Sequence, residues 1–158
     1  MLEVERELPR LLNSQLSRKN PYWLPKHIFL QAYHHCLSYY TYRDEYNALS
    51  AEVGVSGVSY DTISSSNHSV GSATESQAIR LADLAYLIDT IDNAVKEACS
   101  EHPELIPYLH KAVTQEGIKY DYLRDIMHIP CTDKMFYRLR RRVYYIVSKK
   151  KSVTVPFF

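Results

Sequence analysis

The residues best suited to chemistry in this sequence are basic, and they gather at its C-terminal end. Residues 134–158 contain eight lysines and arginines and no acid, whereas residues 1–133 contain 11 basic and all 18 acidic residues. The formal net charge of +1 therefore combines a C-terminal segment of +8 with a preceding segment of −7. A basic end on an acidic body is typical of an anion-binding helix, although a lysine run is also common at a solvated terminus.

The arginines of this segment follow a helical pattern that a solvated tail would lack. Apolar side chains recur at spacings of three and four, which predicts one buried face of a helix over about 133–148. They are Phe136, Leu139, Val143 and Ile146. The opposite side carries Lys134, Tyr137, Arg138, Arg141 and Tyr145. A DNA recognition helix needs this division, because one face packs in the protein while the other enters the major groove.

A short helix and a tight turn precede this basic helix. The helix is predicted over 120–127, and its inner positions are Tyr120, Leu123, Ile126 and Met127. We expect Ile129 to be buried in the turn, and Thr132 or Asp133 to cap the basic helix. Two helices joined by a short turn have the outline of a helix-turn-helix. A basic helix lying on the surface of a helical domain would give the same pattern.

The helix-turn-helix interpretation predicts two kinds of contact with double-stranded DNA. The planar fork of arginine suits guanine edges as well as phosphates. The residues expected to read bases are Lys134, Tyr137, Arg138 and Arg141. The residues expected to hold phosphates are Thr132, Arg140, Arg142, Lys149 and Lys150.

A long helix rich in tyrosine is predicted over about 24–52. Its apolar and aromatic side chains recur at alternating spacings of four and three. They are Ile28, Ala32, His35, Tyr39, Tyr42, Tyr46, Leu49 and Val53. Because tyrosine hydroxyls need water or a partner, this tyrosine stripe is either the edge of a hairpin core or a surface for another protein.

A second long helix, over about 75–99, carries the most regular apolar seam of the chain. Thr74 and Gln77 match a capping box at its start. The seam comprises Leu81, Leu84, Ile88, Ile91, Val95 and Ala98. We expect it to pack on the 24–52 helix as an antiparallel hairpin, or on its own copy in a dimer. The serine-rich segment 54–73 between the two helices is predicted to be a loop, either a connector or a lid.

These elements predict an all-α protein in which an N-terminal long-helix hairpin is followed by a C-terminal helix-turn-helix. Residues 1–101 would form the hairpin and its oligomer or partner contacts. Those contacts are expected at Tyr39, Tyr42, Tyr46, Leu84, Ile88 and Ile91. Residues 102–158 would form the DNA-binding region, with a short helix at 103–116 that Gly117 ends. The roles of residues 1–20 and of the apolar VTVPFF end stay open.

Several segments resemble the RinA/ArpU group of phage-encoded transcriptional regulators. They are SYDTI, SVGSATESQAIRLADL, IDTIDNAV, ELIPYLHKAV and EGIKYDYLRDIMHIPCTDKMFYRLRRRVYYIV, within about 27–148. The resemblance implies a sigma-factor-region-4-like helix-turn-helix that switches on packaging and morphogenesis genes late in the phage programme. The resemblance also implies that the residues in contact with DNA are Thr132, Lys134, Tyr137, Arg138 and Arg141. The chain departs from the group at Pro130-Cys131, where a small polar residue is commoner, which leaves the start of the recognition helix open.

The remaining reactive side chains form no pattern typical of catalysis or metal binding. His34 and His35 are neighbours and would point in different directions on a helix, so they cannot share one ion with Cys36. Cys131 lies in a turn next to basic residues, so it is either a buried plug or a redox-sensing thiol. The S-x-x-K spacing at 148–151 lacks its companion motifs. We therefore expect no enzyme activity, no metal and no cofactor.

The rest of the composition indicates a cytoplasmic protein. No apolar run approaches the roughly 18 residues of a membrane-spanning helix, and the N-terminus is charged, without the apolar core of a signal peptide. The three cysteines are scattered and odd in number, which favours reduced thiols. With the resemblance, this places the protein in the bacterial host cell.

The function favoured by these patterns is that of a sequence-specific DNA-binding regulator of phage or prophage late genes. A homodimer formed through the long helices would double a small DNA footprint, and the acidic body could contact RNA polymerase. Two alternatives remain. One is a DNA-packaging protein similar to a small terminase subunit, and the other is a helical adaptor that binds a protein through the tyrosine stripe.

Overall fold

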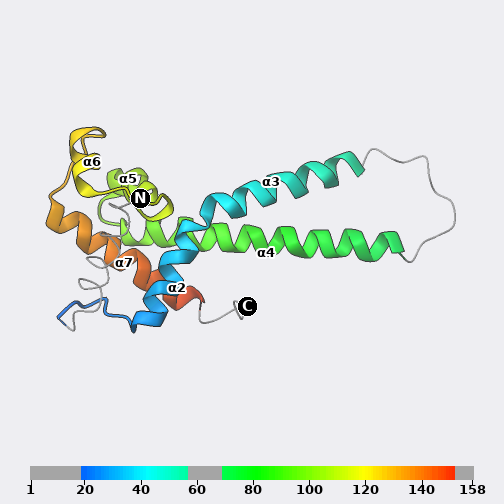
Figure 1. Cartoon of the computed structure of the whole chain (residues 1–158), viewed down its shortest axis with the longest axis horizontal. Helices are drawn as coiled ribbons and strands as arrows, with labels where there is room; N and C mark the ends of the chain where they lie inside the picture. Colours follow the sequence, from blue (N-terminus) through cyan, green and yellow to red (C-terminus); the bar gives the residue numbers. More distant parts are fainter. Residues whose placement is uncertain (1–18, 57–68, 152–158) are drawn as a thin grey trace. The chain divides into compact units, whose positions relative to one another are not determined.

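The computed structural model describes residues 19–56 and 69–151. Its helices are α2 (Lys26–Leu37), α3 (Tyr39–Ser56), α4 (Ser69–Ala98), α5 (Ile106–Thr114), α6 (Tyr120–Asp125) and α7 (Asp133–Lys151), with a 3₁₀ turn, η1, at Pro103–Leu105 (Figure 1). There is no β-strand in these two ranges. The all-α class predicted from the sequence is confirmed.

The chain divides into two compact units. The first contains α2, the end of α4 from Thr90 onward, and α5 to α7; the second contains α3 and α4 up to Asp89. This division differs from the boundary predicted after residue 101, because α2 belongs with the C-terminal helices. α2 packs against both α7 and α5, so its apolar side chains complete the core of the first unit.

An aromatic cluster lies at the centre of the first unit. Phe29 and Tyr33 on α2 meet Tyr144 on α7, with ring centroids 5.3 and 6.1 Å apart. All three side chains are buried, as are Val95 from the end of α4 and Leu109 from α5. Burial of a large apolar side chain contributes about 1.5–3 kcal/mol, so this cluster fixes α7 firmly on α2.

The long helix predicted over 24–52 is interrupted. α2 ends at Leu37 and α3 begins at Tyr39, with Ser38 between them. The backbone N–H of Ser38 donates to the carbonyls of His34 and His35, and its hydroxyl donates to the same His34 carbonyl. A serine side chain that bonds back to a carbonyl four residues earlier competes with the regular helical hydrogen bonds. The apolar periodicity continues across the interruption, which is why the sequence pattern did not reveal it.

The helix that contains the apolar seam begins earlier than its capping box indicated. α4 starts at Ser69, so Thr74 lies inside the helix and does not cap it. Thr74 and the two residues after it are exposed, and polar side chains on an exposed turn give the same spacing as a capping box. Of the predicted loop 54–73, residues 54–56 belong to α3 and residues 69–73 to α4, and residues 57–68 lie outside the described residues.

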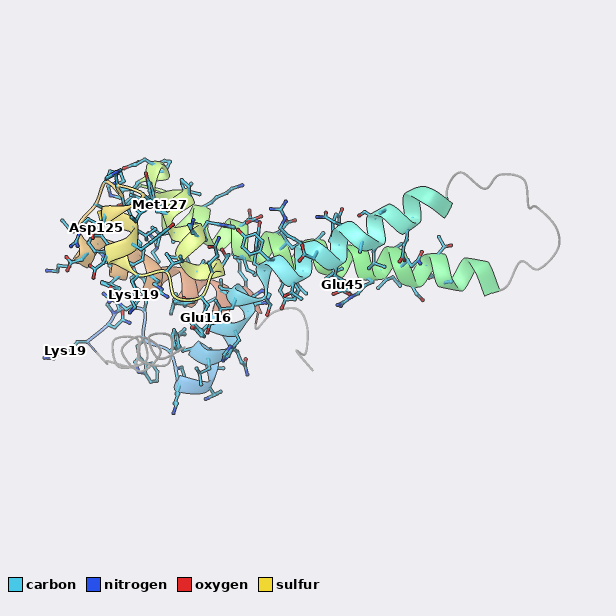
Figure 2. All side chains as sticks on the ribbon, turned by 45° about the horizontal axis from the view of Figure 1, so that its top comes forward. Lys19, Glu45, Glu116, Lys119, Asp125 and Met127 are labelled. Atoms are coloured by element: carbon cyan, nitrogen blue, oxygen red, sulfur yellow. The ribbon has the colours of Figure 1, made fainter. Side chains whose placement is uncertain are left out.

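Within the second unit, Arg80 on α4 forms an ion pair with Glu45 on α3; Figure 2 labels Glu45. The guanidinium donates to both carboxylate oxygens, at 2.8 and 2.9 Å. This hydrogen bond lowers the pKa of the Glu45 carboxyl. Both side chains are about 40% exposed, so the bond orients the helices more than it stabilises them.

The tyrosine stripe lies on the inner side of its helices. Tyr39 is buried, and Tyr42 and Tyr46 are half-buried. On α4, Leu84 and Ile91 are buried and Ile88 is half-buried. This burial favours the hairpin-core interpretation of the stripe over a free surface for another protein.

Two buried groups that lose a proton at high pH, the phenol of Tyr144 and the thiol of Cys99, should make the stability of the fold depend on pH in the alkaline range. Burial raises the pKa of Tyr144 to about 12 and that of Cys99 to about 11. The unfolded chain loses these protons first as the pH rises past about 9 to 10, so the free energy of unfolding should fall between about pH 9 and 12. Tyr144→Phe should remove about 2–3 kcal/mol of that fall, measured by denaturant titration at each pH. Tyr86→Phe, at an exposed site, is the control; equal pH profiles for all three proteins would contradict the assignment.

Candidate nucleic-acid interface

The turn between α6 and α7 is tied to α6 at both ends. The backbone N–H of Ile129 donates to the Leu123 carbonyl at 2.9 Å, and the Tyr120 hydroxyl donates to the Cys131 carbonyl at 2.6 Å. Ile129 is 6% exposed, which confirms the buried side chain predicted for the turn. His128 has a φ of 56°, a left-handed conformation that lets the chain reverse over a short distance.

One inner position predicted for α6 is wrong. Ile126 is 63% exposed, whereas Leu123 is fully buried. α6 ends at Asp125, and the backbone N–H of Ile126 makes the last helical hydrogen bond, to Tyr122. Ile126 was predicted to face inward because it lies three residues after Leu123. The helix ends before Ile126, so this helical spacing no longer sets the direction of its side chain.

Thr132 caps α7. Its side-chain oxygen accepts the backbone N–H of Met135 at 3.3 Å, and its carbonyl accepts that of Phe136 at 3.0 Å. The carboxylate of Asp133 accepts the N–H of Lys134 at 2.8 Å. Because Thr132 is exposed and its own O–H is still a donor, it can both end the turn and bond an anion.

The two faces of α7 differ as the sequence predicts. The predicted apolar side chains are all buried, and Val147 joins them. On the opposite side Lys134, Tyr137 and Arg138 are exposed and Arg141 is half-buried. These four positions, at successive spacings of three, one and three residues, form one stripe along the first two turns of α7. We call them the basic stripe.

The arginines of the basic stripe repel one another. The pKa of Arg141 is lowered by burial first and by the nearby charge of Arg138 second. Arg138, in turn, is exposed to solvent. Two cations this close make an anion at the same place favourable, because it offsets their repulsion.

Arg140, predicted to hold a phosphate, is buried instead. It is 4% exposed, and its Nε donates to the Tyr144 hydroxyl at 3.3 Å. The apolar arc of α7 is broader than the predicted stripe, because α2 covers the side that Arg140 shares with Tyr144. Arg140 therefore belongs to the core and cannot reach a phosphate.

The other predicted phosphate residues divide into two groups. Arg142 is half-buried and donates to the Ala98 carbonyl at 3.3 Å, which ties α7 to the end of α4. Lys150 pairs with Glu97 at 3.4 Å. Lys149 is exposed and lies 5.1 Å from the centre of the Tyr145 ring. Only Thr132 and Lys149 of this set are exposed.

Charges on α6 largely neutralise one another. Arg124 donates to Asp125 at 2.8 Å and lies 3.6 Å from Asp121. This hydrogen bond lowers the pKa of the Asp125 carboxyl. The positive charge next to the turn therefore comes from α7, which carries eight basic residues and one acid.

Cys131 does not have the activated thiol that its basic neighbours suggested. It is half-buried, and burial raises its pKa. The thiolate is therefore disfavoured at neutral pH, which argues against a redox-sensing role. Among the residues that the structure describes, no three His, Cys, Asp or Glu side chains are grouped so that they could hold a metal ion.

The sequence did not predict two contacts near this surface, the hydroxyl bond of Tyr120 and the ring contact of Tyr22. Tyr120 holds the turn through its hydroxyl and packs its ring 5.8 Å from Phe136. Tyr22 packs its ring 5.8 Å from Tyr145, next to the exposed Trp23. The contact of Tyr22 could have been suspected from the segment KNPYWLPK, which mixes aromatic, proline and lysine residues and has no helical periodicity.

Within residues 19–56 and 69–151, no helix is long and apolar enough to cross a membrane. Comparison of the chain with models of protein families, with curated proteins and with solved structures gives no match. What the protein does must therefore be inferred from its own residues.

Proposed function

We propose that this protein is a sequence-specific DNA-binding transcriptional regulator of phage or prophage late genes. The observation that supports this most strongly is the basic stripe on α7. Lys134, Arg138 and Arg141 lie on the face opposite the buried one, at the N-terminal half of a helix that follows a short helix and a tight turn. That is the part of a recognition helix that approaches base edges. The assignment to phage genes follows from the sequence resemblance.

The dimensions of the basic stripe suit a major groove. From Lys134 to Arg141 α7 rises about 10 Å, which is about three base pairs along the duplex. Arg138 and Arg141 would bond guanine edges with their planar forks. Lys134 and Tyr137 would bond neighbouring base edges. At the start of α7, the exposed hydroxyl of Thr132 would donate to a phosphate.

Three base pairs are a short recognition sequence, so we propose that two copies act together. A symmetric dimer reads two half-sites about 34 Å apart. The second unit, residues 39–89, contains seven acidic and two basic residues and would not bind DNA itself. We propose that it supplies contacts to the second copy or to RNA polymerase.

Substitution of the basic stripe should reduce sequence discrimination. Arg138→Ala and Arg141→Ala should each weaken binding to the target duplex by about 1–3 kcal/mol, with a smaller effect on random duplex. Binding would be measured by anisotropy of labelled DNA from the promoter regions of the source replicon. Lys96→Ala, which removes an exposed basic side chain of the first unit away from α7, is the control and should bind as the parent protein does.

Lysine substitutions should behave differently from these arginines. Lys149→Ala should weaken target and random duplex equally and reduce the log–log salt slope by about 0.9, because it contacts only phosphate. If Arg138→Ala also weakened both duplexes equally, the stripe would be a nonspecific patch. If the parent protein bound no duplex at low salt, the proposed function would be wrong.

The oligomeric state tests the two-copy part of the proposal. Light scattering after gel filtration at micromolar concentration should give twice the mass of one 18.4 kDa chain. A mass of a single chain would contradict the dimer, and a large ring would favour the packaging-protein alternative. The measurement needs no DNA, so it is independent of the target sequence.

A further inference from the structure

A defined turn precedes α2. The Trp23 backbone N–H donates to the Asn20 carbonyl at 3.2 Å, and the Tyr22 N–H donates to the Asn20 side chain at 3.0 Å. Pro21 occupies the second position, where its fixed φ favours a turn. Leu24, which follows, is 2% exposed and anchors the segment in the core. Residues 19–25 are therefore held in place, and we call them, together with Lys26 and His27 at the start of α2, the N-terminal turn.

Trp23 is presented to solvent by this turn. It is 42% exposed, although its neighbour Leu24 is buried and Tyr22 is half-buried. It is the only tryptophan in the chain. Aromatic side chains with one apolar face and one polar edge are enriched where proteins meet partners, so the exposed indole is suited to contact a partner.

The N-terminal turn adjoins the end of the basic stripe. Tyr22 packs on Tyr145, which lies one turn after Arg141 on the same side of α7. The ammonium of Lys149 lies 5.1 Å from the centre of the Tyr145 ring. Tyr22, Tyr145 and Lys149 thus connect the N-terminal turn to the helix that carries the basic stripe.

The charge of the N-terminal turn is positive. Lys19 and Lys26 are exposed, and residues 19–37 contain no acid. Lys19 points away from the helices (Figure 2). Lys149, whose ammonium contacts the Tyr145 ring, adds a third exposed lysine. Such a combination of lysines and an aromatic ring suits the phosphates and sugars of a nucleic acid.

We infer that the N-terminal turn is a second DNA contact, in which Trp23 lies against the sugar–phosphate backbone beside the groove that α7 reads. The inference rests on the proposed function and extends its footprint. Tyr145 lies about 16 Å along α7 from Lys134, beyond the three base pairs of the basic stripe. The N-terminal turn therefore reaches the flanking phosphates, where Lys19, Lys26 and Lys149 bind without reading sequence.

The single tryptophan gives a direct test. The full chain would be titrated with duplex from the source replicon, with excitation at the red edge so that tyrosine does not contribute. Binding to labelled duplex would be followed in parallel by anisotropy. We expect the emission of Trp23 to change and its quenching by acrylamide to fall as the duplex is bound. Binding with unchanged Trp23 emission and quenching would overturn the inference alone, whereas no binding would overturn the proposed function as well.

Two variants separate contact from structure. Trp23→Ala should weaken target and random duplex alike, by about 5- to 10-fold, and Lys26→Ala should reduce the salt slope by about 0.9. Lys96→Ala, another exposed lysine of the first unit, is the matched control and should leave the slope unchanged. Parent-like affinity of Trp23→Ala and a parent-like slope of Lys26→Ala would overturn the inference and favour a protein partner for the indole. Circular dichroism would confirm that each variant is folded.

Discussion

The burial of one side of α7 is the constraint on which the rest of the first unit depends. Phe136, Val143 and Val147 are fully buried, and Tyr144 is enclosed by the rings of α2. Because this face is committed to the core, the opposite face must carry the polar side chains. The position of the basic stripe, and its orientation away from the protein, follow from that packing.

The same packing separates the arginines of α7 by role. Arg138 and Arg141 lie on the outer face, Arg142 ties the helix to the end of α4, and Arg140 is enclosed beside Tyr144. A buried arginine is costly unless it is hydrogen-bonded, and its bond to the tyrosine hydroxyl offsets part of that cost. Net charge does not distinguish these four arginines, whereas burial leaves only Arg138 and Arg141 on the outer face.

The sequence predicted the features that depend on local periodicity. The all-α class, the apolar face of α7, the buried Ile129 and the cap at Thr132 all follow from spacing and residue type. It did not predict features set by tertiary contacts. The break at Ser38 leaves the apolar period intact, and the burial of Arg140 depends on α2, which is distant in sequence. The sequence of the N-terminal turn has no apolar periodicity, so its position beside α7 is seen only from the contact between Tyr22 and Tyr145.

Methylation interference is the most direct test of the central claim, that the basic stripe of α7 enters a major groove. Duplex from the source replicon would be methylated sparsely with dimethyl sulfate, which marks guanine N7 in the major groove and adenine N3 in the minor groove. Methylation of guanines within about three consecutive base pairs of each half-site should prevent binding. Binding that tolerates methylation at every guanine N7, or that is blocked only by adenine N3, would contradict it.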